Sequence, residues 1–331
     1  MYVMRSFREG PSCLHACSTP SNRLILTAHT PPEASPLRLV RVFPFLLLLL
    51  SGSTPAAPVE FKPSDRLVLI GGTLVEREQR YGYWETMLAD RYPGLKVRNL
   101  GWSGDNVTGE ARRAFDLGDP NIGRKRLVDL ALAEKPTVIL ICYGANEAFE
   151  GQAGLENFKK GYEKLLDELA PAKARMILLS PPPLEDKGRP LPDPSLQNQR
   201  LAIYRDAIKQ IAEARKLTFA DLFQVLGEGK APLKDLTDNG LHFTGAGYKE
   251  TASAFAAALG FTDGAFSDGM EKARQAIVAK NQLYFYKWRP QNETYLTGFR
   301  KHEQGRNAKE VAEYDPLVAE LESQIEKLLK K

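Results

Sequence analysis

Five short apolar runs, separated by segments with helical spacing, constrain the fold more than any other feature of the chain. They are Leu67–Ile70, the weaker Val97–Leu100, Thr137–Cys142, Met176–Leu179 and Leu217–Ala220. Strands that are covered on both faces need continuous apolar runs of this kind rather than alternating ones. The pattern predicts an α/β fold, a three-layer α/β/α sandwich around a mainly parallel five-stranded sheet.

The segments between these runs carry apolar stripes at three-and-four spacing. Two of the stripes are Leu155, Phe158, Tyr162, Leu165, Leu166 and Leu169, and then Leu201, Tyr204, Ile208 and Ile211. Such stripes are typical of helices that pack on a core. We interpret them as core residues and not as cofactor contacts.

The first 57 residues resemble a leader. Arg38 and Arg41 precede the apolar run Val42–Leu50, and small residues follow at 51–57. This order is typical of a secretory signal peptide, and the run has about half of the ~20 residues that a membrane span needs. We expect a signal peptide at about 37–57, a periplasmic or secreted protein, and no membrane span once the signal is removed. The alternative is that the run forms a further strand of the domain.

The signal begins late, so we expect translation to start downstream and residues 1–36 not to be made. The predicted organisation is a leader at 1–57, an α/β domain at 58–263, and a C-terminal part at 264–331. In that last part we expect a helix at Met270–Leu283, an irregular aromatic strap made of Tyr284–Pro290 and Tyr295–Phe299, and a terminal amphipathic helix. The strap either packs along the domain edge or lines a substrate or partner groove.

Charge and residue counts exclude several classes of function. The leader carries five Arg and two Glu, so the net charge of +4 falls to +1 without it, and no basic footprint for nucleic acid remains. Of three Cys, only Cys142 lies outside the leader, and His242 is the one His outside the leader and the polar tail. We therefore expect no metal site, no cofactor and no intrachain disulfide.

Polar and glycine-rich loops follow three of the predicted strands. They are Gly71–Thr73, Gly101–Asp105 and Tyr143–Glu147. Ligands of open parallel sheets bind beyond the carboxyl ends of the strands, so these loops should converge with the turn that carries His242. No dinucleotide or phosphate-loop fingerprint is present. Nucleophilic chemistry at an acyl centre remains, which needs a hydroxyl, an imidazole, a group that holds the imidazole, and donors for an oxyanion.

These loops resemble the SGNH hydrolases, also called the GDSL lipase/esterase family, over residues 64–260. The matching segments are Ile70-Gly71-Gly72-Thr73-Leu74, Gly104 in its loop, Gly144-Ala145-Asn146-Glu147, and His242 followed by Gly247-Tyr248. The resemblance implies the family's three-layer, flavodoxin-like fold and the hydrolysis of carboxylic esters. By residue, it implies Thr73 as nucleophile, His242 as base, and an oxyanion hole from the Thr73 and Gly104 N–H groups and the Asn146 amide.

The chain departs from the family pattern at three positions, and at the first of them Gly72 stands where the family has an acid. Thr73 stands where the family has Ser, and its methyl group restricts the side chain. Asn239 stands three residues before His242, where the family has Asp, and Asp238 lies one place too early. Either Asp238 or Asn239 is therefore expected to hold the imidazole.

Each site residue also has a plainer interpretation. Thr73 would cap a helix, Asn146 would close a turn, and His242 would be an ordinary buried histidine. Ser103 is a rival for the role of nucleophile, and its plainer interpretation is a hydrogen bond within the loop. The expected substrate contacts are Glu76, Trp102, Ser103 and Trp288.

Two functions follow from these interpretations. The first is hydrolysis of a small ester, for example an acetyl ester on a carbohydrate. The second is a catalytically silent domain of the same fold that binds a glycan or a protein.

Overall fold

The computed structural model describes residues 59–113, 118–230, 233–261 and 265–330. The predicted leader and signal peptide lie outside the described residues and stay predictions. Among the helices of the described part, none combines the length and the apolar character needed to cross a bilayer.

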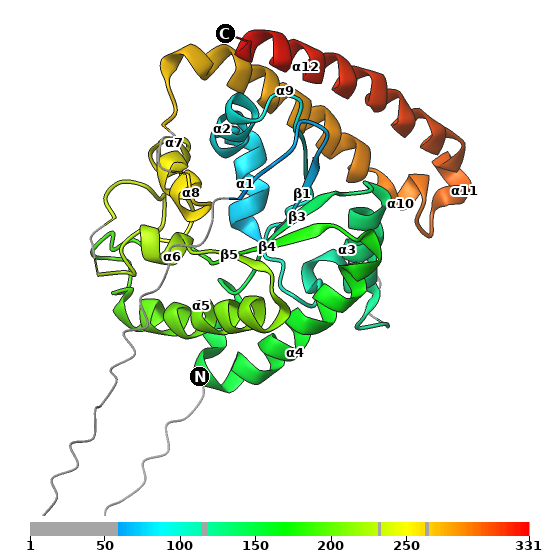
Figure 1. Ribbon diagram of the computed structural model, residues 1–331. Helices are drawn as coiled ribbons and strands as arrows, with labels where there is room; N and C mark the ends of the chain where they lie inside the picture. The colour runs from blue at the N-terminus through cyan, green and yellow to red at the C-terminus, as the bar shows by residue number, and fades with distance from the viewer. Residues whose placement is uncertain (1–58, 114–117, 231–232, 262–264, 331) are drawn as a thin grey trace, which may run out of the picture. The chain divides into compact units, whose positions relative to one another are not determined.

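Each of the five apolar runs forms a strand, and the predicted sheet is confirmed. The strands are β1 (Arg66–Gly71), β2 (Lys96–Asn99), β3 (Val138–Cys142), β4 (Arg175–Leu179) and β5 (Thr218–Ala220). All neighbouring pairs are parallel, in the order β2-β1-β3-β4-β5 (Figure 1). This is the flavodoxin-like order, in which the chain changes direction across the sheet between β1 and β3.

Helices cover both faces of the sheet, as predicted. Val68 and Ile70 pack on one side, and Leu67 and Leu69 pack on the other, because successive side chains of a strand point to opposite faces. The first face is covered by α3 (Ile122–Ala133), α4 (Gly151–Leu169) and α5 (Ser195–Arg215). The second is covered by α1 (Thr73–Tyr81), α2 (Tyr83–Arg91), α7 (Gly245–Glu250) and α8 (Ala252–Ala258).

Short elements join these layers. They are η1 (Glu110–Arg113), η2 (Glu147–Glu150), η3 (Ala170–Ala172), α6 (Leu222–Val225), η4 (Asp268–Met270), α10 (Glu293–Leu296), α11 (Lys301–Gln304) and η5 (Gly305–Glu313). The apolar stripes predicted for α4 and α5 are buried, so their interpretation as core is confirmed.

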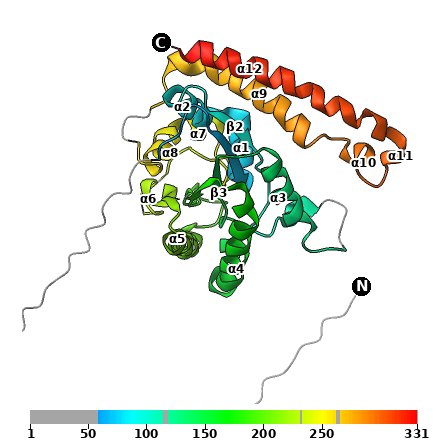
Figure 2. The ribbon, with the colours of Figure 1, turned by 45° about the vertical axis from the view of Figure 1, so that its right-hand side comes forward.

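Two long helices, α9 (Glu271–Trp288) and α12 (Tyr314–Leu329), form the C-terminal part and lie side by side (Figures 1 and 2). The prediction of an irregular strap was wrong for Tyr284–Trp288, which is the end of α9, and for Tyr295 and Leu296, which end α10. The reason is spacing: Ile277, Asn281, Tyr284 and Trp288 recur every three or four residues and are all buried. The aromatic residues continue the buried face of the helix.

Helix α9 protects the edge of the sheet. Among the described strands, β2 pairs with β1 alone, so its outer edge would otherwise offer unpaired backbone groups to another chain. The Lys280 ammonium of α9 donates to the Val97 carbonyl of β2 at 3.1 Å. The C-terminal helices therefore complete the fold at this edge.

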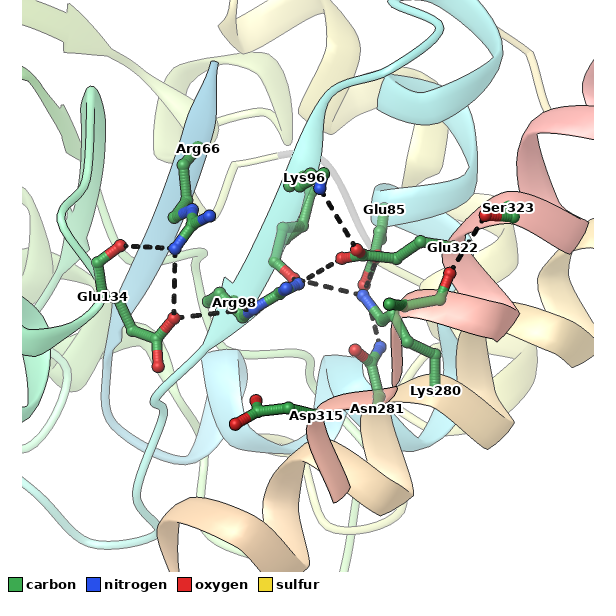
Figure 3. Close-up of polar contacts among 12 residues, drawn as sticks. Arg66, Glu85, Lys96, Arg98, Glu134, Lys280, Asn281, Asp315, Glu322 and Ser323 are labelled. Carbon is green, nitrogen blue, oxygen red and sulfur yellow. Dashed lines mark hydrogen bonds and ion pairs between the residues drawn. The ribbon is translucent and has the colours of Figure 1, made fainter. Parts of the chain in front are cut away.

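Buried charges attach both helices to the sheet (Figure 3). Lys280 forms an ion pair with Glu85 of α2, and Asn281 donates to the same carboxylate at 2.8 Å. Burial lowers the pKa of Lys280, although the charge of Glu85 opposes that shift. On α12, Glu322 binds Arg98 of β2; burial raises the pKa of Glu322, but the hydrogen bond and charge of Arg98 outweigh burial and lower it.

Replacing Lys280 with Met should lower the free energy of unfolding by about 3–5 kcal/mol, because it leaves the Glu85 carboxylate buried without a cation. Lys287→Met is the matched control on the same helix. Its ion pair with Asp315 is partly exposed, so the loss should stay within about 1 kcal/mol. Urea unfolding of both variants measures the difference, and equal losses would contradict the account of the buried pair.

Candidate active site

The candidate site lies at the carboxyl ends of β1 and β3, where the sheet order reverses. Gly71 and Cys142 are register partners at these ends, so the loops that follow them start side by side. A pocket opens there; its lining comes from the loops after β1 to β4 and from the histidine turn. The lining residues are Gly72, Thr73, Leu74, Asp105, Cys142, Tyr143, Gly144, Ala145, Asn146, Glu147, Pro181, Pro182, Leu241 and His242. Thr73 and His242 thus line one pocket, although they are far apart in the sequence.

Thr73 is the first residue of α1. Gly72 precedes it in the capping position, and no side-chain hydrogen bond caps this helix. The Thr73 hydroxyl instead accepts the Gly104 N–H at 3.0 Å. The interpretation of Thr73 as a helix cap is therefore wrong, and its hydroxyl is turned toward the loop after β2.

Asn146 reaches the same loop from the end of β3. Its Nδ2 donates to the Asp105 carbonyl at 2.8 Å, which leaves the second Nδ2 hydrogen for another partner. Asp105 is itself fixed, because its carboxylate accepts from Arg112 at 2.6 Å and from the Tyr143 hydroxyl at 2.8 Å. Gly104 lies on this loop and Asn146 is bound to it, so the hydrogen bonds of Asp105 help to hold both donors in place.

Glu147 holds two site loops together, a role that the sequence did not reveal. Its carboxylate accepts the Val107 N–H at 2.8 Å and the Gly144 N–H at 3.0 Å. Burial raises the pKa of Glu147 to about 6, although these backbone hydrogen bonds favour the ionised form. The sequence showed an acid at a helix start, where acids are common in any protein, so it gave no signal of burial.

The turn before His242 fixes the orientation of the Asn239 amide. Asn239 Oδ1 accepts the backbone N–H groups of Leu241 at 3.1 Å and of His242 at 2.9 Å. Its Nδ2 therefore faces the imidazole and lies 3.0 Å from His242 Nδ1. An amide NH₂ can only donate, so Nδ1 of the neutral ring must accept, and the ring proton sits on Nε2.

Asp238 takes a different partner. Its carboxylate accepts from the Arg77 guanidinium of α1 at 2.8 Å. Of the two residues expected to hold the imidazole, Asn239 is the one that contacts it. Partial burial lowers the pKa of His242, the positive charge of Arg77 lowers it further, and Asp238 opposes both.

Two of the four expected substrate contacts belong to the loop after β2, the other two contact it, and none of the four lines the pocket. Glu76 is buried and accepts the Ser103 N–H, while the Ser103 side chain is exposed. The guanidinium carbon of Arg289 lies over the Trp102 ring, 3.4 Å from the ring centroid. The ring centroids of Trp102 and Trp288 are 6.0 Å apart. Contact of these residues with substrate stays a prediction.

Comparisons with known proteins find several that are similar to this chain. A curated relative, the isoamyl acetate-hydrolyzing esterase 1 homolog of Rattus norvegicus, is 26% identical over 198 residues, which are 55% of this chain and 76% of the relative. A catalytic mutant of an acetylxylan esterase from Geobacillus stearothermophilus is 22% identical, with a TM-score of 0.48 over 61% of this chain and 97% of that one. A gut microbial diltiazem-metabolizing enzyme has the same fold, with a TM-score of 0.59 and 11% identity over 82% of this chain and 96% of that one. The model of the GDSL-like Lipase/Acylhydrolase family matches residues 68–250, more than half of the chain, and the protein therefore belongs to that family.

Proposed function

We propose that this protein hydrolyses a small carboxylic ester, with Thr73 as nucleophile and His242 as general base. The observation that carries the proposal is that the Thr73 hydroxyl, the Asn146 amide and the His242 imidazole line one pocket at the switch point of the sheet. The GDSL-like Lipase/Acylhydrolase family, to which the chain belongs, consists of ester hydrolases. A hydroxyl, a base and an amide donor in one pocket are the groups that acyl transfer requires.

The reaction proceeds in two halves. Thr73 Oγ1 attacks the ester carbonyl carbon, His242 Nε2 takes the hydroxyl proton, and the carbonyl oxygen becomes an oxyanion. The Thr73 and Gly104 N–H groups and the Asn146 amide stabilise that oxyanion once the Gly104 N–H turns to it from the Thr73 hydroxyl, and each such donor is worth about 3 kcal/mol in related chemistry. The leaving alcohol then takes the proton from His242, and a water molecule activated by the same imidazole releases the acid from Thr73.

The Asn239 amide makes this base a poor one. The resting ring carries its proton on Nε2, the nitrogen that has to accept the proton of Thr73. Catalysis needs the other tautomer, in which Nδ1 is protonated and Asn239 presents its oxygen. In serine proteases the corresponding Asp-to-Asn change costs about 10⁴-fold, or ~5.5 kcal/mol. We therefore propose slow turnover.

The pocket suits a small acyl group. Its volume of about 40 Å³ is that of roughly three water-sized groups. An acetyl group has three heavy atoms, and the curated rat relative is named for hydrolysis of an acetate ester. The near-neutral charge of the chain without its leader favours an uncharged alcohol part, such as a carbohydrate. The predicted leader would deliver the enzyme to the periplasm or the medium.

A catalytically silent binding domain is the second candidate. The same hydrogen bond from Asn239 to the ring favours it, because this bond keeps His242 Nε2 protonated. A silent domain would bind a glycan or a protein through the same pocket without turnover. Variants at residues 73 and 239 separate the two functions.

Thr73→Ala should reduce hydrolysis of p-nitrophenyl acetate to the rate in buffer, because it removes the attacking oxygen. Thr73→Ser should raise kcat, because it removes the methyl group that crowds the attack path. Thr297→Ala, at an exposed site outside the pocket, is the matched control and should leave the rate unchanged. Undiminished activity in Thr73→Ala would exclude Thr73 as the nucleophile.

Asn239→Asp should move the ring proton of neutral His242 from Nε2 to Nδ1, which ¹⁵N NMR of the imidazole detects directly. It should also raise kcat/KM by at least about 10-fold, within the ~10⁴-fold that separates Asp from Asn in serine proteases. Asn121→Asp, at an exposed residue whose side chain caps no helix, controls for the added charge. A tautomer shift without any gain in hydrolysis favours the silent domain.

The pH profile should follow the titration of His242. Only the neutral imidazole accepts a proton, and burial together with Arg77 lowers its pKa below 6.5. kcat/KM should therefore rise with pH, reach half its plateau below pH 6.5 and stay level through neutrality. Arg77→Ala removes a positive charge and should shift the rise to higher pH. Arg80→Ala on the same helix should not, and identical shifts in both variants would contradict this assignment.

A further inference from the structure

The C-terminal part contains a second, larger cavity. It lies between the end of α9, the loop at residues 290–292, η5 and the start of α12, and has a volume of about 570 Å³. That volume falls within the roughly 300–1,000 Å³ of small-molecule sites. None of the residues that line it belongs to the lining of the candidate active site.

Two tyrosines from different helices form the aromatic part of this cavity. Tyr286 of α9 and Tyr314 of α12 have ring centroids 6.4 Å apart and planes tilted by 48°. Both side chains are partly exposed, and the Tyr286 hydroxyl accepts from Gln282 at 3.1 Å, which fixes the direction of its ring. The cavity therefore offers oriented aromatic surface to a ligand.

Amides and carboxylates form the polar part. Asn292 donates to Gln304 at 3.3 Å, which orients its amide, and Asn307 adds a second amide. Glu310 and Glu313 contribute exposed carboxylates, and the lining contains no Lys or Arg. Amides both donate and accept hydrogen bonds, and carboxylates accept them. Because cations are absent from this lining, phosphates, sulfates and acidic sugars are disfavoured.

We propose that this cavity binds a neutral oligosaccharide. A pyranose ring presents a face of C–H groups, which packs on aromatic rings, and a rim of hydroxyls, each of which donates and accepts hydrogen bonds. The cavity pairs tilted tyrosines with amides and carboxylates, which matches both parts of a sugar. An amine ligand would pair with the two carboxylates, but these are exposed to water, so such ion pairs would add little to its affinity.

This site is separate from ester hydrolysis and stands without it. Trp288, expected to contact substrate, packs into the core, whereas Tyr286, two residues earlier, lines the cavity. A helix places residues two positions apart on different faces. The aromatic end of α9 therefore serves both the core and the proposed sugar site.

Isothermal titration of the full chain with xylohexaose, cellohexaose and mannohexaose tests the proposal. We expect saturable binding of at least one of these neutral probes. Tyr314→Ala and Tyr286→Ala should each weaken the affinity about 10-fold, equivalent to ~1.4 kcal/mol. Asn307→Ala should weaken it too, without removing an aromatic packing residue, and thermal unfolding shows which variants stay folded.

Two controls locate the binding. Tyr295→Ala removes a tyrosine of the same C-terminal part that does not line the cavity, and affinity should be unchanged. Thr73→Ala should also bind normally, because the proposed site does not depend on hydrolysis. Three results would overturn the proposal: no binding of any probe, equal affinity in the folded cavity variants, or salt-sensitive binding of spermidine in place of the sugars. Loss of sugar binding in Thr73→Ala would place the sugar in the candidate active site instead.

Discussion

The parallel pairing of β1 with β3 is the constraint on which the candidate site depends. It sets the ends of two strands side by side, so that Thr73 begins α1 beside the loop that carries Asn146. Because β2 pairs with the other edge of β1, its loop brings Gly104 within hydrogen-bonding distance of Thr73. A one-residue slip of register between β1 and β3 would turn every side chain of the shifted strand to the opposite face of the sheet and separate these groups.

The Asn239 amide determines which tautomer the neutral His242 imidazole adopts. Two backbone N–H groups bind the oxygen of Asn239, so its NH₂ group is left to face His242. An aspartate in the same place would accept both backbone groups and the ring N–H, and would support the tautomer that a base needs. Asp238, one position earlier, is bound to Arg77 and does not replace it. The same turn that places the imidazole therefore keeps the proton of the neutral ring on Nε2.

The strands, the helical layers and the loops that converge could be predicted from the sequence, because they follow from continuous apolar runs and stripes at helical spacing. The end of α9 was mispredicted although Tyr284 and Trp288 keep the helical spacing, because a run of aromatic residues suggested an irregular segment and their burial depends on contacts with distant elements. The choice between Asp238 and Asn239 depends on the turn hydrogen bonds that aim Asn239 at the ring and on the ion pair of Asp238 with Arg77, which local sequence does not reveal. The hydrogen bonds by which Glu147 links two loops could not be predicted for the same reason, because they reach the backbone of another loop.

The central claim is that Thr73 and His242 act on the same reacting carbon or phosphorus atom, and covalent labelling tests this most directly. Incubation with diethyl p-nitrophenyl phosphate, followed by peptide mass spectrometry, identifies the residue that attacks. The account predicts a diethylphosphoryl adduct on Thr73 that forms faster in Asn239→Asp and is absent in His242→Ala. An adduct on Ser103 or another residue, or one on Thr73 that forms equally fast without His242, would contradict it.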